Sequence, residues 1–137
     1  MPLVRIDLMK GRPPEERAAI GDAIHQAMTE TIDIPDNDRF QIITEHDAVD
    51  LRFDPDFMGG ERDERHIFIE FTLKSGRTVE QKRNLYRRIT ELLEERVGQR
   101  PGNLLIALND NEMIDWSFGY GGMQLIDGVE AGPRTAA

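Results

Sequence analysis

The sequence predicts an α+β fold in which two β-α-β repeats form a four-stranded sheet with two helices on one face, plus a short C-terminal hairpin or arm. Two segments of the chain align at an offset of 65 residues, and both change from a strand pattern to a helix pattern at the same place. With 137 residues, we expect one domain over 1–137, with repeat halves at 2–45 and 66–109.

Two Gly-Arg pairs, Gly11-Arg12 and Gly76-Arg77, mark equivalent points of the repeat. Apolar residues alternate before each pair, which is the pattern of a strand with one buried face. After each pair they recur at helical spacing, which predicts a helix with one apolar stripe. The apolar positions that agree are Val4, Ile6, Leu8, Ile20, Ile24, Ala27 and Met28 with Ile69, Phe71, Leu73, Leu85, Ile89, Leu92 and Leu93.

The helix boundaries follow from capping residues. Pro13-Pro14 suits the first turn of the first helix, and Thr78 with Gln81 has the spacing of a capping box for the second. We expect the helices to end near Asp33 and Gly98, because a proline follows each position within three residues.

A second strand is predicted in each half, over 39–44 and 103–108, and a right-handed crossover makes it parallel to the first. The linker, 45–65, is acidic and predicts an irregular excursion. Glycines in the segment 113–128 indicate a short hairpin or arm, and 129–137 is expected to be a frayed tail.

Helices on one side leave the other face of the sheet bare, and Phe68 lies on that face. Because exposed apolar patches of this size mark interfaces, we expect a homo-oligomer in which sheets pack together. The net charge of −9 argues against nucleic acid as a partner. No apolar run approaches the ~20 residues of a membrane-spanning helix. Arg5 and Asp7 interrupt the first apolar stretch, so a secretory signal is not predicted and a cytoplasmic protein is expected.

Metal chemistry is not indicated by the composition. The chain has no cysteine, which excludes disulfides and thiolate sites. The three histidines, His25, His46 and His66, lack the spacing of metal ligands and are expected to be solvated. His46 follows a strand end and could border a pocket.

Four features together resemble the tautomerase superfamily: a Met1-Pro2 start, the Gly-Arg turn, Ile-Ile-Thr-Glu at 42–45, and Asp-Trp-Ser-Phe-Gly at 115–119. The fused double unit is most similar to the malonate semialdehyde decarboxylase branch, over residues 2–126. The resemblance implies a homotrimer that needs no cofactor, acts on a small oxo acid and uses an amino-terminal proline as its catalytic group.

Pro2 becomes a free secondary amine only if Met1 is removed, which a small second residue permits. An α-amine titrates near about 8 in water, and burial or nearby cations lower that pKa. With a pKa near about 7 the nitrogen can act as both general base and general acid. The structural alternative is that Pro2 merely begins a strand, where its missing N–H costs little.

Arg77 aligns with an arginine that the decarboxylases use to bind a carboxylate. Their Arg-x-Arg pair is incomplete in this chain, because Ser75 occupies the first position. Lys74 or Arg12 could substitute as the second cation. Each of these charges could instead be solvated.

Asp38 matches the decarboxylase position that partners the proline or orients water, although it could equally be a turn residue. A carboxylate there would raise the pKa of the amine and oppose the arginines. Trp116 and Phe118 are expected to wall the pocket and exclude water, or else simply to pack the arm.

The predicted function is keto–enol tautomerisation of a 2-oxo acid such as phenylpyruvate. Alternatives are decarboxylation of malonate semialdehyde, hydration of an acetylenic acid with Asp38 activating water, and a non-catalytic oligomeric binding module of the same fold. The non-catalytic alternative remains because Ser75 stands where the decarboxylases have an arginine.

Overall fold

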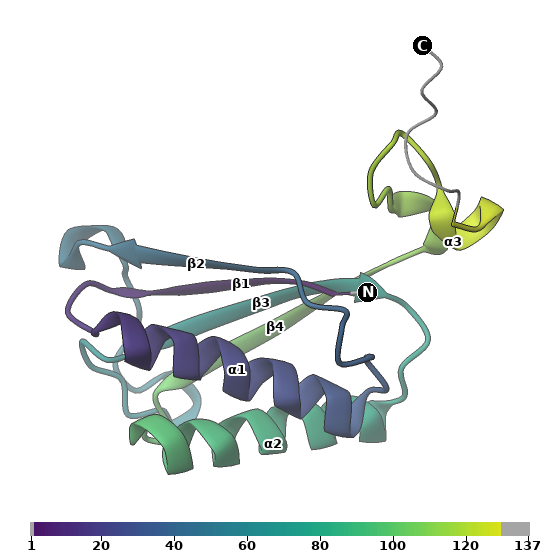
Figure 1. The fold of residues 1–137 in the computed structure, drawn as a ribbon. Coiled ribbons are helices and arrows are strands. Elements are labelled where there is room, and N and C mark those ends of the chain that lie inside the picture. Colours follow the sequence, from purple (N-terminus) through teal and green to yellow (C-terminus); the bar gives the residue numbers. More distant parts are fainter. Residues whose placement is uncertain (1, 130–137) are drawn as a thin grey trace.

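The computed structural model describes residues 2–129 and has two β-α-β units in sequence (Figure 1). The elements are β1 (Pro2–Met9), α1 (Pro14–Thr31), β2 (Gln41–His46), β3 (Ile67–Lys74), α2 (Val79–Val97), β4 (Leu104–Asn111) and the short α3 (Gln124–Asp127). Three single 3-10 turns lie at Ala48–Asp50, Phe57–Gly59 and Met113–Asp115.

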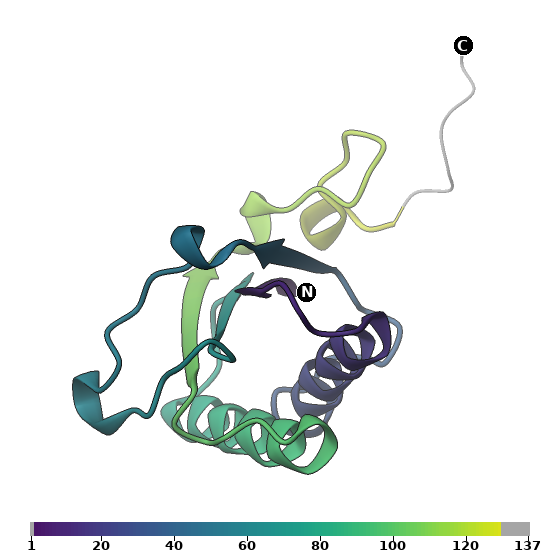
Figure 2. The same ribbon diagram turned by 90° about the vertical axis from the view of Figure 1, so that its left-hand side faces the viewer.

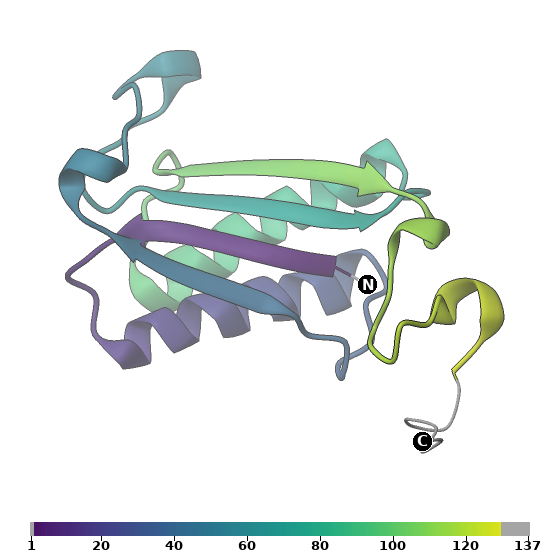
Figure 3. The same cartoon turned by 90° about the horizontal axis from the view of Figure 1, so that it is seen from above.

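The sheet has the order β2-β1-β3-β4, which confirms the predicted four-stranded α+β architecture. Each repeat contributes a parallel pair, β1 with β2 and β3 with β4. The two units join through the antiparallel pair β1–β3, in which Pro2 lies opposite Leu73. Both helices cover the same face of the sheet, and the other face is open (Figures 1 and 3).

The core lies between the sheet and the helices, as the alternation predicts. Alternate side chains of β1 and β3, from Val4 to Leu8 and from Ile67 to Leu73, are at most 1% exposed. The stripes of α1 and α2 that pack against them include Ile20, Ile24, Leu85 and Ile89. Burying apolar surface of this kind stabilises the fold by ~25 cal/mol per Å².

The helix ends behave as their residues predict. Pro13 is the N-cap of α1 and a proline follows it in the first turn. The Thr78 hydroxyl accepts from the Gln81 N–H at 3.1 Å, while the Gln81 side chain accepts from the Thr78 N–H at 2.9 Å. This capping box begins α2, and Gly98 ends it at a φ of 68°, a left-handed conformation that glycine adopts freely.

Of the predicted C-terminal hairpin or arm, the structure has the arm, because residues 113–129 contain no strand. The arm instead folds around Gln124, whose side chain accepts from the Phe118 N–H at 2.8 Å and donates to the Gly119 carbonyl at 2.9 Å. The structure also places β2 two residues later than predicted and extends β4 to Asn111. The predicted tail, apart from Val129, lies outside the described residues.

The open face of the sheet carries apolar side chains. Ile42 is 40% exposed and Leu105 is 42% exposed. The linker curves past one edge of the sheet (Figure 2), and its Leu51 is buried. None of the helices within residues 2–129 combines the length and apolar character needed to cross a membrane.

Candidate active site

One end of the sheet gathers most of the residues singled out in the sequence. β1 begins there, the loop before β2 arrives there, and β3 and β4 end there, because β3 runs antiparallel to β1. The C-terminal arm leaves β4 at the same end (Figures 1 and 3). We call this the Pro2 end, and the opposite end, where β1 leads into Arg12, the Arg12 end.

Pro2 is buried at the start of β1, between the strands β2 and β3. Its position opposite Leu73 brings the end of β3 alongside it. On the other side, the Val4 N–H donates to the Phe40 carbonyl at 3.0 Å, so the residues just before Phe40 approach the start of β1. The nitrogen of Pro2 therefore lies between the Asp38 loop and the β3–α2 turn.

Asp38 is half-buried in the loop between α1 and β2. Its N–H donates to the Pro35 carbonyl at 3.0 Å, which closes a turn. The residue lines a cavity of about 380 Å³, bounded by Asn37, Asp38, Phe40, Phe118, Tyr120, Gln124, Leu125 and Val129. Most of these side chains are apolar, so the carboxylate is one of few charges at that cavity.

Arg77 is half-buried in the turn from β3 to α2. Its guanidinium donates to the Lys74 carbonyl at 3.0 Å and to the Ile32 carbonyl at 3.1 Å, which ties the turn to the end of α1. A guanidinium has five N–H donors, so these two bonds leave others for a ligand. Arg77 lines a second cavity of about 220 Å³, together with Ile32, Asp33, Lys74, Ser75, Gly76 and Gln81.

Lys74 and Ser75 stand beside Arg77 in that cavity, at the end of β3. The Ser75 hydroxyl donates to a Glu112 carboxylate oxygen at 3.0 Å, and its N–H donates to the Asn111 carbonyl at 2.7 Å. Lys74 pairs with Asn111 in the β3–β4 ladder. Ser75 thus links the β3 end to the start of the arm, while Lys74 supplies a second cation.

The aromatic residues of the arm form a stack that reaches the Asp38 loop. The Trp116 and Phe118 rings are parallel within 6° at a centroid distance of 5.7 Å, and Phe118 lies 6.0 Å from the Phe40 ring. The Trp116 indole N–H donates to the Asn111 side chain at 2.7 Å. The stack spans from β4 to β2 across the Pro2 end.

Arg12 is the exception, because it lies at the opposite end of the sheet from Pro2. Its guanidinium is 5% exposed and donates to Glu16 at 3.1 Å, to the Arg65 carbonyl at 2.6 Å and to the Gln99 side chain at 2.9 Å. Burial lowers the pKa of the Arg12 guanidinium, and the nearby positive charge of Arg65 lowers it further. Within one protomer Arg12 holds the fold together and does not join the Pro2 end.

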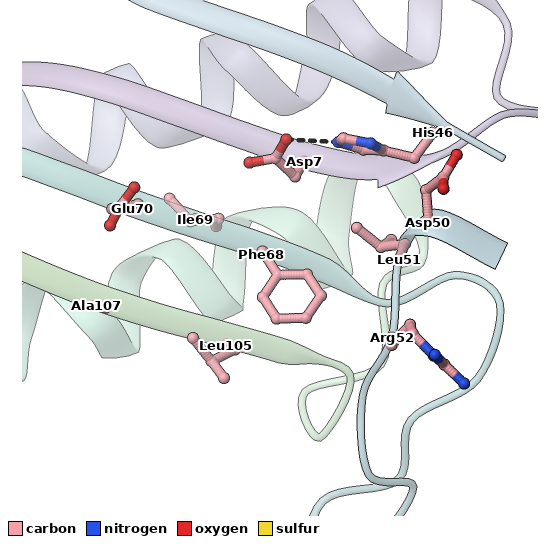
Figure 4. A pocket seen from close by; sticks show the side chains of 10 residues that line it. All are labelled: Asp7, His46, Asp50, Leu51, Arg52, Phe68, Ile69, Glu70, Leu105 and Ala107. Atoms are coloured by element: carbon pink, nitrogen blue, oxygen red, sulfur yellow. Dashed lines mark hydrogen bonds and ion pairs between the residues drawn. The ribbon is translucent and has the colours of Figure 1, made fainter. Parts of the chain in front are cut away.

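A further hollow of about 340 Å³ lies on the open face of the sheet (Figure 4). Asp7 and His46 form a pair in it at 2.6 Å, beside Phe68 and Leu105. None of the residues predicted for catalysis or substrate binding lines this hollow. Within residues 2–129, no group of three or more histidine and acidic side chains is arranged to hold a metal ion.

Comparison with known proteins shows the family of the chain. Models of the tautomerase enzyme family match residues 38–119 and residues 2–56. "Probable tautomerase YusQ" of Bacillus subtilis (strain 168) is 39% identical over 127 residues, which cover 93% of this chain and 100% of YusQ. The chain belongs to the tautomerase family.

Solved tautomerase-fold structures extend the similarity. A malonate semialdehyde decarboxylase from FG41, inhibited by 3-bromopropiolate, is 40% identical with a TM-score of 0.87, covering 96% of this chain and 99% of that one. A second malonate semialdehyde decarboxylase is 30% identical with a TM-score of 0.87, covering 92% and 97%. A fused 4-OT symmetric trimer shares the fold at 23% identity and a TM-score of 0.67, covering 81% and 86%.

Three residues of the candidate site were not singled out from the sequence. Phe40 continues the aromatic stack, Asn111 holds Trp116, and His25 lies beneath the Asp38 loop. The prediction that the histidines are solvated is wrong for His25 and His66, which are 2% and 0% exposed. His25 directly follows Ile24, which belongs to the apolar stripe of the helix. This position is the sequence feature that could have predicted its burial.

Proposed function

We propose that this tautomerase-family chain interconverts the keto and enol forms of a small 2-oxo acid, with phenylpyruvate as a suitable example. The observation that supports this most is the meeting of Pro2, the Asp38 loop and Arg77 at one end of the sheet. Removal of Met1 would leave a secondary amine at the end of the sheet that also holds two hollows, one lined by Asp38 and the other by Arg77.

In the proposed reaction, the unprotonated Pro2 nitrogen takes a proton from the carbon next to the carbonyl. The electron pair of that C–H bond forms a C=C bond while the C=O π pair moves onto the oxygen, and the Pro2 ammonium then gives its proton to that oxygen, which yields the enol. No atom is gained or lost. Arg77 binds the substrate carboxylate and its charge stabilises the enolate, with Lys74 as a neighbouring cation.

The surroundings of Pro2 suit this role. Burial of the nitrogen favours its neutral form, and the cations of Lys74 and Arg77 act in the same direction. Asp38 opposes them, because a carboxylate stabilises the ammonium. Trp116 and Phe118 would keep water away from the enolate, which strengthens every charge interaction inside the pocket.

Decarboxylation of malonate semialdehyde is the second candidate, and the 40% identity to a decarboxylase of known structure favours it. Loss of carbon dioxide from a 3-oxo acid leaves the same kind of enolate, which takes its proton from Pro2. In this chain Ser75 offers a hydroxyl near the reacting group, so Lys74 would have to supply the second positive charge.

We propose that the active unit is a homotrimer built through the open face of the sheet. The exposed Ile42 and Leu105 on this face, and Ile114 at 63% exposure on the arm, support burial against further copies. Sedimentation equilibrium should give three times the 15.7 kDa chain mass. A monomer at micromolar concentration would contradict this assembly.

The deciding experiment uses untagged protein whose Met1 loss is confirmed by mass spectrometry. Phenylenolpyruvate ketonisation and malonate semialdehyde consumption are then followed for the wild type and for Pro2→Ala and Arg77→Ala. We expect Pro2→Ala to lower kcat/KM by about 10³-fold, since general acid–base catalysis supplies 10²–10⁴. Turnover of the semialdehyde alone would favour the decarboxylase, and a wild type that turns over neither compound would favour a binding module.

A further inference from the structure

We propose that His25, a buried histidine of α1, is the positioning residue that holds the Asp38 loop against Pro2. The inference rests on the proposed function, because it assigns His25 a role in that same site. His25 itself stands beneath the loop and is not placed in contact with substrate.

His25 is built into the protein interior and makes one directed hydrogen bond. Its imidazole is 2% exposed, and its Nε2 lies 2.8 Å from the Asp36 main-chain carbonyl oxygen. A carbonyl oxygen only accepts, so Nε2 carries the hydrogen and donates. The other ring nitrogen, Nδ1, has no hydrogen-bond partner among the described residues. The ring is therefore oriented by the loop alone.

The bond falls at the middle of a series of contacts between α1 and the segment leading into β2. One turn earlier along α1, the Gly21 carbonyl accepts from the Gln41 side chain at 2.8 Å and Asp22 accepts from Arg39 at 2.6 Å. One turn later, the Met28 carbonyl accepts from the Ile34 N–H at 3.5 Å. Since residues three or four apart share a helix face, these contacts hold the segment along one side of α1.

Asp38 lies between the His25 contact at Asp36 and the Asp22 contact at Arg39. Loss of the histidine bond would free the Asp36 carbonyl while leaving the contacts at Arg39 and Gln41 intact. The turn closed by the Asp38 N–H and the Pro35 carbonyl would then lose its nearest attachment to the helix. The effect is expected to be local to residues 35–38.

The equivalent place in the other repeat shows what this loop does for β1. Adding 65 to Pro2 and Asp38 gives Ile67 and Asn103, and there the Ile67 N–H donates to the Asn103 carbonyl at 3.3 Å. The parallel registers of the two strand pairs correspond in the same way. By this correspondence the Asp38 main chain lies beside the Pro2 nitrogen, so a shift of the loop changes the surroundings of the catalytic amine.

The test compares His25→Leu, which removes the donor, with His25→Gln, whose amide N–H reaches about as far as Nε2. Misplacement of a catalytic group by 1 Å can cost about 10²-fold, so we expect a tenfold lower kcat for His25→Leu with KM changed less than twofold. His25→Gln should recover kcat to within threefold of the wild type. In an Asp38→Ala background, His25→Leu should cause no further loss, because its effect passes through that loop.

His66 provides a matched control. It is also buried, and one of its ring nitrogens, Nε2, has no hydrogen-bond partner within the described residues, but it lies at the Arg12 end. His66→Leu should lower Tm and leave kcat unchanged at temperatures where the protein is folded. If His25→Leu behaves in the same way, with a lower Tm and an unchanged kcat, the positioning role is wrong.

Amide hydrogen exchange separates failure of this inference from failure of the proposed function. We expect exchange of the Asp38 N–H to accelerate at least tenfold in His25→Leu and to stay near the wild-type rate in His25→Gln. If the Asp38 N–H exchanges faster in His25→Leu but the wild type shows no turnover, the proposed function is wrong and the anchoring of the loop by His25 is supported. Unchanged exchange and kcat in an active protein would overturn the inference alone.

Discussion

At the Pro2 end of the sheet, Arg77 and Asp38 border open hollows, whereas at the Arg12 end the equivalent positions Arg12 and Asn103 are buried in a hydrogen-bonded network. The backbone at the two places is nearly the same. Gly11 and Gly76 have φ values of 126° and 122°. The bond from Lys10 N–H to the His46 carbonyl, 2.9 Å, corresponds to the bond from Ser75 N–H to the Asn111 carbonyl, 2.7 Å.

The difference comes from what covers each end. The linker returns over the Arg12 end, where the Arg65 carbonyl accepts from both Arg12 and Gln99, and Asp63 accepts from Asn103 at 2.7 Å. At the Pro2 end the C-terminal arm is the nearby segment instead (Figure 3), and its Phe118 and Gln124 line the hollow beside Asp38. The two ends have similar backbones, but the linker gives the Arg12 end a structural role, whereas the arm leaves the Pro2 end available for a candidate catalytic role.

The largest effect should come from exchanging the two arginines for glutamine. Arg77→Gln removes a charge from the hollow, and we expect kcat/KM to fall about 10²-fold while the free energy of unfolding falls by about 1 kcal/mol. Arg12→Gln removes the buried guanidinium that donates to Glu16, to the Arg65 carbonyl and to Gln99, and we expect the free energy of unfolding to fall by about 3 kcal/mol with kcat/KM unchanged. Urea unfolding and steady-state kinetics measure both. Equal losses of kcat/KM in the two variants would contradict the assignment of a catalytic role to the Pro2 end and a structural role to the Arg12 end.

A smaller effect is expected when the carboxylate of the Pro2 end is introduced at the Arg12 end. Asn103 is 1% exposed, and Asn103→Asp would place a second carboxylate against Asp63. We expect unfolding free energy at pH 7 to fall by about 2 kcal/mol. Repulsion raises the pKa of the new carboxyl in the folded protein, so stability should recover as the pH falls and the group is protonated. Unfolding curves at pH 5 and pH 7 test this, and an Asn103→Asp protein as stable as the wild type at pH 7 would contradict it.

The smallest effect is a pH dependence at the Arg12 end. Burial lowers the pKa of His66 below its ordinary value of 6.5, against a smaller raising effect of the Asn103 hydrogen bond. The unfolded chain therefore binds this proton more readily, and stability falls as the pH drops below 6.5. His66→Gln should flatten the dependence of unfolding free energy on pH between 5 and 7.5. A slope as steep as that of the wild type would show that His66 does not titrate in this way.

Much of the fold could be predicted because local patterns decide it. Alternation and helical stripes located the strands and helices, and Thr78 with Gln81 located the start of α2. The prediction left a hairpin and an arm open because glycines at 119 and 121–122 indicate a turn without specifying what flanks it. There, a single side chain, Gln124, organises the segment by bonding to the backbone on both sides.

The candidate site was harder to predict because it depends on contacts between distant segments. The sequence placed Pro2, Asp38 and Arg77 in one site through resemblance, and their positions in the fold are compatible with that. Through the same resemblance it offered Arg12, as an alternative to Lys74, for the second cation of the site. Arg12 is held at the far end by the Arg65 carbonyl of the linker and by the Gln99 side chain, which lies between α2 and β4. The burial of His25 and His66 was also missed, because residue spacing along the sequence predicted solvated side chains.

The peptide bond between His66 and Ile67 has a consequence for any protein made by joining two such units in one polypeptide. Ile67 occupies the place of Pro2 but donates an ordinary amide hydrogen to Asn103 at 3.3 Å. An amide nitrogen has no basic lone pair. The main-chain nitrogen of Ile67 therefore cannot act as the proposed base, even where its surroundings resemble those of Pro2. A fused chain of this kind therefore has one amino-terminal amine for every two units, and its second unit can take a purely structural role.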